Sequence, residues 1–121
     1  PTYIASSEGI YAEDTGSSWA ATPGSGDVLT GIVGALVAHG AVAGRSVEES
    51  AAMAVRVHSR AALLASLGAS FGESAGKTWP ADGARRFLSD TDTAGRGAPV
   101  TASEISQSIS AAIRDVRNGT L

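Results

Sequence analysis

The chain has 121 residues with a net charge of −3, it contains no cysteine, and 43% of its residues are hydrophobic. The length suits one small domain, and the acidic balance argues against nucleic-acid binding and against attachment to an anionic membrane surface. Because cysteine is absent, disulfides and thiolate zinc sites are excluded, and a cytoplasmic location is expected.

The first residues predict a β-hairpin. Residues 2–5 and 9–12 read as two short strands, and the Ser-Ser-Glu-Gly segment between them has the composition of a turn. The start of the chain lacks a basic region followed by a long apolar run, so no secretory signal is expected.

The most apolar segment predicts a helix from about Gly26 to His39, with Gly40 as its C-cap. Branched apolar residues form a broad face and small residues fill the other side, which predicts a helix buried all round. Between Asp27 and Arg45 no residue except His39 can carry a charge, and such a stretch is only just long enough to cross a bilayer. We expect a buried core helix and no membrane span.

Two further helices carry clear start signals. Ser46 and Glu49 form a capping box that begins a helix ending near 67–68, and Thr101 and Glu104 form a second box. The last helix is expected to end at 118–119. Its apolar stripe consists of Ile105, Ile109, Ala112, Ile113 and Val116.

Residues 69–99 differ from the rest of the chain. Gly, Ser, Asp and Thr are frequent there and no periodicity is strong, which predicts a loop insertion with a short helical turn at 84–88. Lys77 and Trp79 are conceivable neighbours of an adenine, and we expect the pair Arg85 and Arg86 to be solvated.

The segment 22–27, Thr-Pro-Gly-Ser-Gly-Asp, delivers one carboxylate onto the first turn of the apolar helix. Backbone N–H groups at a helix start bind anions, and glycines let a phosphate approach closely. Asp27 beside such an anion hole supplies a base for a hydroxyl group, as phosphoryl transfer requires. The alternative is a tight turn whose acid merely stabilises the helix dipole. A carboxylate at the mouth of a buried helix is in a costly position, which favours a functional role.

Other candidate residues favour structural roles. We expect His58 to be a packed or hydrogen-bonded histidine, and His39 to be a favourable partner of a helix dipole. The two are too far apart in sequence to indicate a metal site. The glycine turn is not a Walker A loop because no Lys-Ser/Thr pair follows it, and Leu29 replaces the third glycine of a dinucleotide fingerprint.

These motifs resemble the C-terminal part of the ribokinase-like superfamily, and within it the ADP- or ATP-dependent NAD(P)H-hydrate dehydratase family. In that family an Ala-Thr-x-Gly-(Ser/Thr)-Gly-Asp-Val-Leu segment opens a buried helix, as 21–29 does here. A Val-His-Ser-x-Ala pattern at 57–61 and the helix start at 101–104 match two later helices. The resemblance covers most of 1–68 and 99–117.

The resemblance implies an α/β fold, with 1–121 as the C-terminal portion of one ribokinase-like three-layer α/β/α domain. The N-terminal half, which carries most of the parallel sheet in the family, would be missing, so the chain alone should not be a complete enzyme. Relatives are commonly homo-oligomers, which implies the same here. The assembled protein would repair NAD(P)H hydrate, using ADP in preference to ATP, together with Mg²⁺.

The same resemblance assigns roles to four residues. Asp27 would be the catalytic base and would face the substrate, while Gly24, Ser25 and Gly26 would present N–H groups to the transferring phosphoryl group, with Gly26 beside the nucleotide. Two alternatives remain open. A ribokinase-like kinase for a vitamin or sugar hydroxyl would use the same chemistry but leave phosphate on its product, and a non-catalytic fragment would only bind nucleotide or a partner.

Overall fold

The computed structural model describes residues 2–7, 9–14, 18–68 and 97–119. The predicted turn at 84–88 lies outside the described residues, as do Lys77, Trp79, Arg85 and Arg86 and nearly all of the expected insertion.

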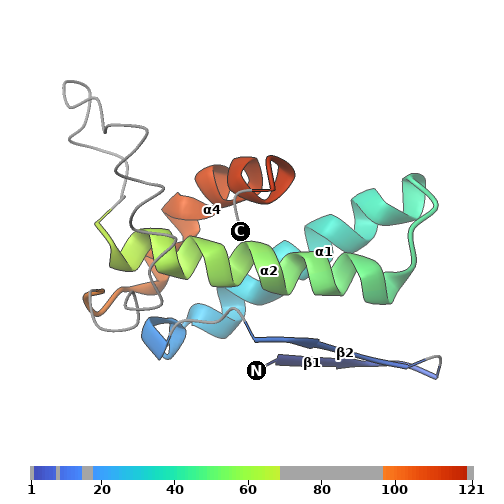
Figure 1. Ribbon diagram of the computed structural model, residues 1–121, viewed down its shortest axis with the longest axis horizontal. Helices are drawn as coiled ribbons and strands as arrows, with labels where there is room; N and C mark the ends of the chain where they lie inside the picture. Colours follow the sequence, from blue (N-terminus) through green and yellow to red (C-terminus); the bar gives the residue numbers. More distant parts are fainter. Residues whose placement is uncertain (1, 8, 15–17, 69–96, 120–121) are drawn as a thin grey trace.

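The described residues form a hairpin, a short 3₁₀ turn η1 (Ser18–Ala20) and three α-helices. Helix α2 (Val47–Ser66) runs through the middle of the molecule, with α4 (Ala102–Arg117) on one side and α1 (Ser25–Val42) on another (Figure 1). The hairpin packs along α2 as well. This helix-rich arrangement with a small sheet is compatible with the expected α/β class, and among the described residues it shows two strands of a sheet and no third.

The hairpin confirms the prediction for the first residues. Strands β1 (Thr2–Ala5) and β2 (Ile10–Glu13) are antiparallel, with Thr2 opposite Glu13 and Ala5 opposite Ile10. The second strand begins one residue later than predicted because Gly9 belongs to the turn, where its carbonyl accepts the Ser6 N–H at 2.9 Å.

Helices α2 and α4 begin as their capping boxes predicted. The Ser46 hydroxyl accepts the Glu49 N–H at 3.1 Å, and the Glu49 carboxylate accepts the Ser46 N–H at 3.1 Å. Thr101 and Glu104 make the same pair of bonds at the start of α4. In the predicted stripe of α4, Ile105 and Ala112 are buried but Ile113 is 38% exposed, because it lies at the edge of the face that packs on α2.

Gly40 does not cap α1, contrary to the prediction. It is buried inside the helix, which continues to Val42, and a Cβ at this position would collide with the Ser50 hydroxyl of α2. The turn that follows the helix instead uses Gly44, whose φ of +71° is in the left-handed region. Gly40 is therefore required for the close approach of α1 to α2.

The prediction that α1 is buried all round is wrong for the described chain. Ser25, Ile32 and Gly40 are its buried residues, and 17% of the helix is buried, although its length and composition would allow it to cross a membrane. The physical reason is the lack of a second covering layer among the described residues, because α1 packs on α2 and, at fewer points, on α4.

The core lies where α2 meets its neighbours. Small residues of α2 allow the close approach, and Ala54, Ala61 and Ala62 have no exposed surface. An ion pair reinforces the α2–α4 contact: Arg60, which is 6% exposed, donates from Nε and from its terminal nitrogen to one oxygen of Asp115, at 2.9 and 2.7 Å.

Candidate functional site

The site predicted from the sequence lies at the N-terminus of α1. Gly24 precedes the helix with a φ of +83°, and a Cβ on it would lie 3.1 Å from the Cβ of Ala102 at the start of α4. Both the left-handed backbone and the close contact require glycine here. The first intrahelical bond of α1 follows, from the Val28 N–H to the Gly24 carbonyl at 3.2 Å.

Helix α1 has no side-chain cap, unlike α2 and α4. The N–H groups of Gly26 and Asp27 precede the first intrahelical donor, so they have no partner within the helix. Both residues are exposed. An open helix N-terminus with unpaired donors is the geometry that favours an anion.

The three expected N–H donors are not equivalent. The Ser25 N–H donates to the Thr22 carbonyl at 3.1 Å, so it points back into the turn. Gly26 has open space around it, since a Cβ built there would meet nothing within 4 Å. Among the described residues, the N–H groups without a backbone partner at this helix start are therefore those of Gly24, Gly26 and Asp27, and Asp27 was not among the predicted donors.

Asp27 lies in the first turn of α1, as predicted, but its side chain is exposed. The argument that this carboxylate is in a costly buried position is therefore wrong for the described chain, because α1 itself is largely uncovered. Within the described part of the chain the carboxylate makes no ion pair, and it remains available to a ligand approaching the helix start.

The first residue of α1 is hydrogen-bonded to a histidine of α2. His58, in the middle of α2, places Nε2 3.0 Å from the Ser25 hydroxyl and 3.1 Å from the Ser25 carbonyl oxygen. The two residues are 8% and 6% exposed. Burial lowers the pKa of His58, and the hydrogen bond to the Ser25 backbone opposes this shift.

The expectation of a hydrogen-bonded His58 is thus confirmed, but its partner was not predicted. The two residues are 33 positions apart in sequence, so no local pattern joins them. The Val-His-Ser-x-Ala segment at 57–61 was the one available signal, and it did not identify Ser25 as the partner.

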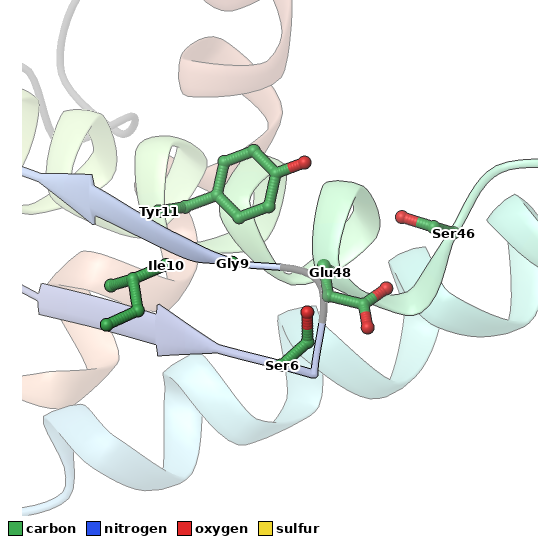
Figure 2. A pocket seen from close by; sticks show the side chains of 6 residues that line it. All are labelled: Ser6, Gly9, Ile10, Tyr11, Ser46 and Glu48. Atoms are coloured by element: carbon green, nitrogen blue, oxygen red, sulfur yellow. The ribbon is translucent and has the colours of Figure 1, made fainter.

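A separate hollow lies at the N-terminal end of α2, between the hairpin turn and the start of the helix. Figure 2 shows its lining residues Ser6, Gly9, Ile10, Tyr11, Ser46 and Glu48. Hydrogen bonds from its own backbone N–H and from the Ser46 side chain lower the pKa of Glu48. Ser46 and His58 are twelve residue steps apart, or about 18 Å along a helix, and the Glu48 carboxylate disfavours an anion in the hollow.

The described residues contain no cluster of three or more His, Asp or Glu side chains that could hold a metal ion. Magnesium in phosphoryl-transfer sites is bound through one or two carboxylates and through substrate phosphates. The exposed Asp27 carboxylate beside free backbone donors fits a magnesium ion that arrives on a nucleotide, and it does not fit a cage made by the protein alone.

Comparison with known proteins identifies the relatives of this chain. A profile of the family described as NAD(P)H-hydrate dehydratase matches residues 2–77. The bifunctional NAD(P)H-hydrate repair enzyme Nnr of Mycobacterium leprae is 51% identical over 55 residues, covering 46% of this chain and 11% of that protein. Enzymes with the same name from Mycobacterium tuberculosis and Corynebacterium glutamicum are 54% and 57% identical over 37 residues, which is 31% of this chain.

The matched segments cover 8% of the tuberculosis protein and 6% of the Corynebacterium protein. The chain thus spans about a tenth or less of the length of the curated relatives it matches. No solved structure matches the chain significantly.

Proposed function

This chain belongs to the NAD(P)H-hydrate dehydratase family, and we propose that it takes part in the nucleotide-dependent repair of hydrated NADH or NADPH. The observation that carries the proposal is the uncapped start of α1, where Gly26 and Asp27 present free N–H groups beside an exposed carboxylate.

In the proposed reaction the Asp27 carboxylate accepts the proton of the ring hydroxyl as the hydroxyl oxygen attacks the terminal phosphorus of ADP. The bond from that phosphorus to the bridging oxygen breaks, and AMP leaves. Phosphate then departs with the electrons of the carbon–oxygen bond, and loss of a ring proton restores the double bond. The net change converts hydrate and ADP into NAD(P)H, AMP, phosphate and a proton.

The backbone donors stabilise the transferring phosphoryl group. Gly24 gives the chain its turn, and the N–H groups of Gly24, Gly26 and Asp27, which have no backbone partner among the described residues, would donate to the phosphoryl oxygens. Ser25 supports this arrangement through its own backbone bond to Thr22. Magnesium bound to the nucleotide supplies charge neutralisation.

We further propose that the activity requires an N-terminal half of the domain, which covers the apolar α1 and completes the substrate pocket. The support is the exposure of α1 together with the small share of the relatives' length that the chain spans. A homo-oligomer and a cytoplasmic location belong to the same proposal.

The test uses the full-length polypeptide that carries this chain. The protein is incubated with hydrated NADH, ADP and magnesium, and the return of the NADH absorbance is followed. Recovery should require ADP, and Asp27→Asn should slow it by about 10²–10⁴-fold, the usual contribution of a general base. His39→Gln, at the far end of α1, is the matched control and should retain activity.

Three outcomes separate the alternatives. A protein that binds ADP, recovers no NADH and leaves phosphate on another hydroxyl compound is a ribokinase-like kinase. Nucleotide binding without any turnover indicates a non-catalytic domain. Full activity in Asp27→Asn would show that this carboxylate is not the base.

A further inference from the structure

We propose that His58 is a positioning residue: its imidazole holds Ser25, and through Ser25 it holds the first turn of α1 in the orientation that presents the Gly26 and Asp27 N–H groups and the Asp27 carboxylate to the phosphoryl group. This inference rests on the proposed function and adds to it a residue that has no place in the reaction described above.

The contact is well defined on both sides. One ring nitrogen, Nε2, lies within hydrogen-bond distance of both oxygens of Ser25, at 3.0 Å from the hydroxyl and 3.1 Å from the carbonyl. Because a carbonyl oxygen only accepts hydrogen bonds, we assign the hydrogen to Nε2, which donates to Ser25. Both residues are buried, so water is a poor substitute for either partner.

The position of Ser25 explains why this contact matters. Ser25 is the first residue of α1, and Gly26 and Asp27 follow it directly. A helix turns by a fixed angle per residue, so a fixed Ser25 sets the directions of the next two N–H groups. Helix α1 has no side-chain cap, and Ser25 is one of its few buried residues, so the imidazole is one of the groups that hold this end in place.

The residues around His58 are closely packed. The histidine lies in the most buried part of α2, between Val57, which is 3% exposed, and the Arg60–Asp115 ion pair to α4. An imidazole held by the core in this way fixes the position of the first turn of α1 relative to the core. The same arrangement, in which a well-packed neighbour orients the reactive group, is required of precise catalytic sites.

The decisive comparison is His58→Leu with His58→Gln in the full-length protein. The leucine has no donor, and we expect a loss in kcat of about 10²-fold, the usual effect of displacing reacting groups by about 1 Å. The glutamine amide can reach Ser25 with an N–H group and should recover most of the loss. Val57→Ala, which weakens the same part of the core but leaves the imidazole, is the matched control and should keep its kcat in the folded protein.

Two readouts do not depend on turnover. The ¹⁵N shifts of the His58 ring report which nitrogen carries the hydrogen, and ADP affinity reports the state of the helix start. A hydrogen on Nδ1, or an unchanged kcat and ADP affinity in a folded His58→Leu protein, would overturn the proposal. Equal losses in His58→Leu and Val57→Ala would also overturn it, since they indicate a purely structural residue.

If the proposed function is wrong, the activity and ADP-binding measurements give a different result than if only the role of His58 is wrong. If the wild-type protein has no dehydratase activity, the function is wrong, but ADP binding still tests His58. Affinity that falls in the leucine variant and returns in the glutamine variant would support the positioning role. Affinity that does not change in the leucine variant would contradict it.

Discussion

Helices α1 and α2 have similar lengths, 18 and 20 residues, but their burial is the reverse of what their compositions suggest. Asp27 is the single acidic residue of α1, whereas α2 contains Glu48, Glu49, Arg56 and Arg60. Yet α2 is buried along nearly all of 54–66, and α1 is mostly exposed.

An apolar helix is buried only where other elements cover it. Helix α2 has α4, α1 and the hairpin packed around it, and its small residues allow them to approach closely. Hydrophobic side chains gain free energy only from surface that is actually removed from water. The open face of α1 is therefore the part of the molecule with the most to gain from another layer.

The largest expected loss of stability comes from a carboxylate placed in α2, and the same change in α1 is its comparison. Ala61→Glu puts a charge at a position with no exposed surface, and we expect it to destabilise the fold by more than about 4 kcal/mol, enough to unfold many domains. Ala35→Glu, on the exposed side of α1, should change the stability of this chain by less than about 0.5 kcal/mol. Urea unfolding followed by circular dichroism measures both.

The same pair of variants tests whether α1 is covered in the full-length protein. If the proposed N-terminal half packs on α1, Ala35→Glu should destabilise that protein strongly while leaving this chain unaffected. Equal and small effects in both proteins would show that this side of α1 stays open.

A smaller effect is expected from the ion pair that ties α2 to α4. Asp115→Ala leaves the Arg60 guanidinium buried without its carboxylate, and the free energy of unfolding should fall by about 3 kcal/mol. Arg56→Ala is the matched control, because its pair with Glu13 spans 3.4 Å and the Arg56 side chain is 45% exposed. That change should be below about 1 kcal/mol, and equal losses in the two variants would contradict the distinction.

The smallest expected effect is a pH dependence carried by the contact between α1 and α2. Because burial lowers the pKa of His58 below its usual value of 6.5, the unfolded chain binds a proton more readily than the folded chain. The stability that neutral His58 contributes is therefore full above pH 6.5 and falls as the pH drops through and below that value. Urea unfolding between pH 7.5 and pH 5 should show this slope in the wild type and lose it in His58→Gln.

The neighbours of His58 support its assignment as the group responsible. Arg56 and Arg60 on the same helix are paired with Glu13 and Asp115, and the Ser25 end of α1 presents only uncharged atoms to the ring. Val57→Ala is the control, since it weakens the same part of the core but leaves the imidazole in place, and it should keep the slope. A slope that persists in His58→Gln would assign it to another group.

Part of the candidate site could be predicted from the sequence and part could not. The glycine turn and the place of Asp27 in the first turn of α1 follow from residues adjacent in the chain, and the structure has them as expected. The exposure of Asp27, the use of the Ser25 N–H within the turn and the contact from His58 were not predicted. Each of these depends on what packs against the helix start.

Local sequence patterns specify the hairpin, the capping boxes at Ser46 and Thr101, and the glycine turn before α1. Such features form among residues a few positions apart, whose propensities and side-chain hydrogen bonds act along the chain. The packing of the helices sets the other features, in which Gly40 faces Ser50, Ser25 contacts His58, and α1 is exposed while α2 is covered. These contacts join distant segments, and their free energy depends on which surfaces the fold brings together.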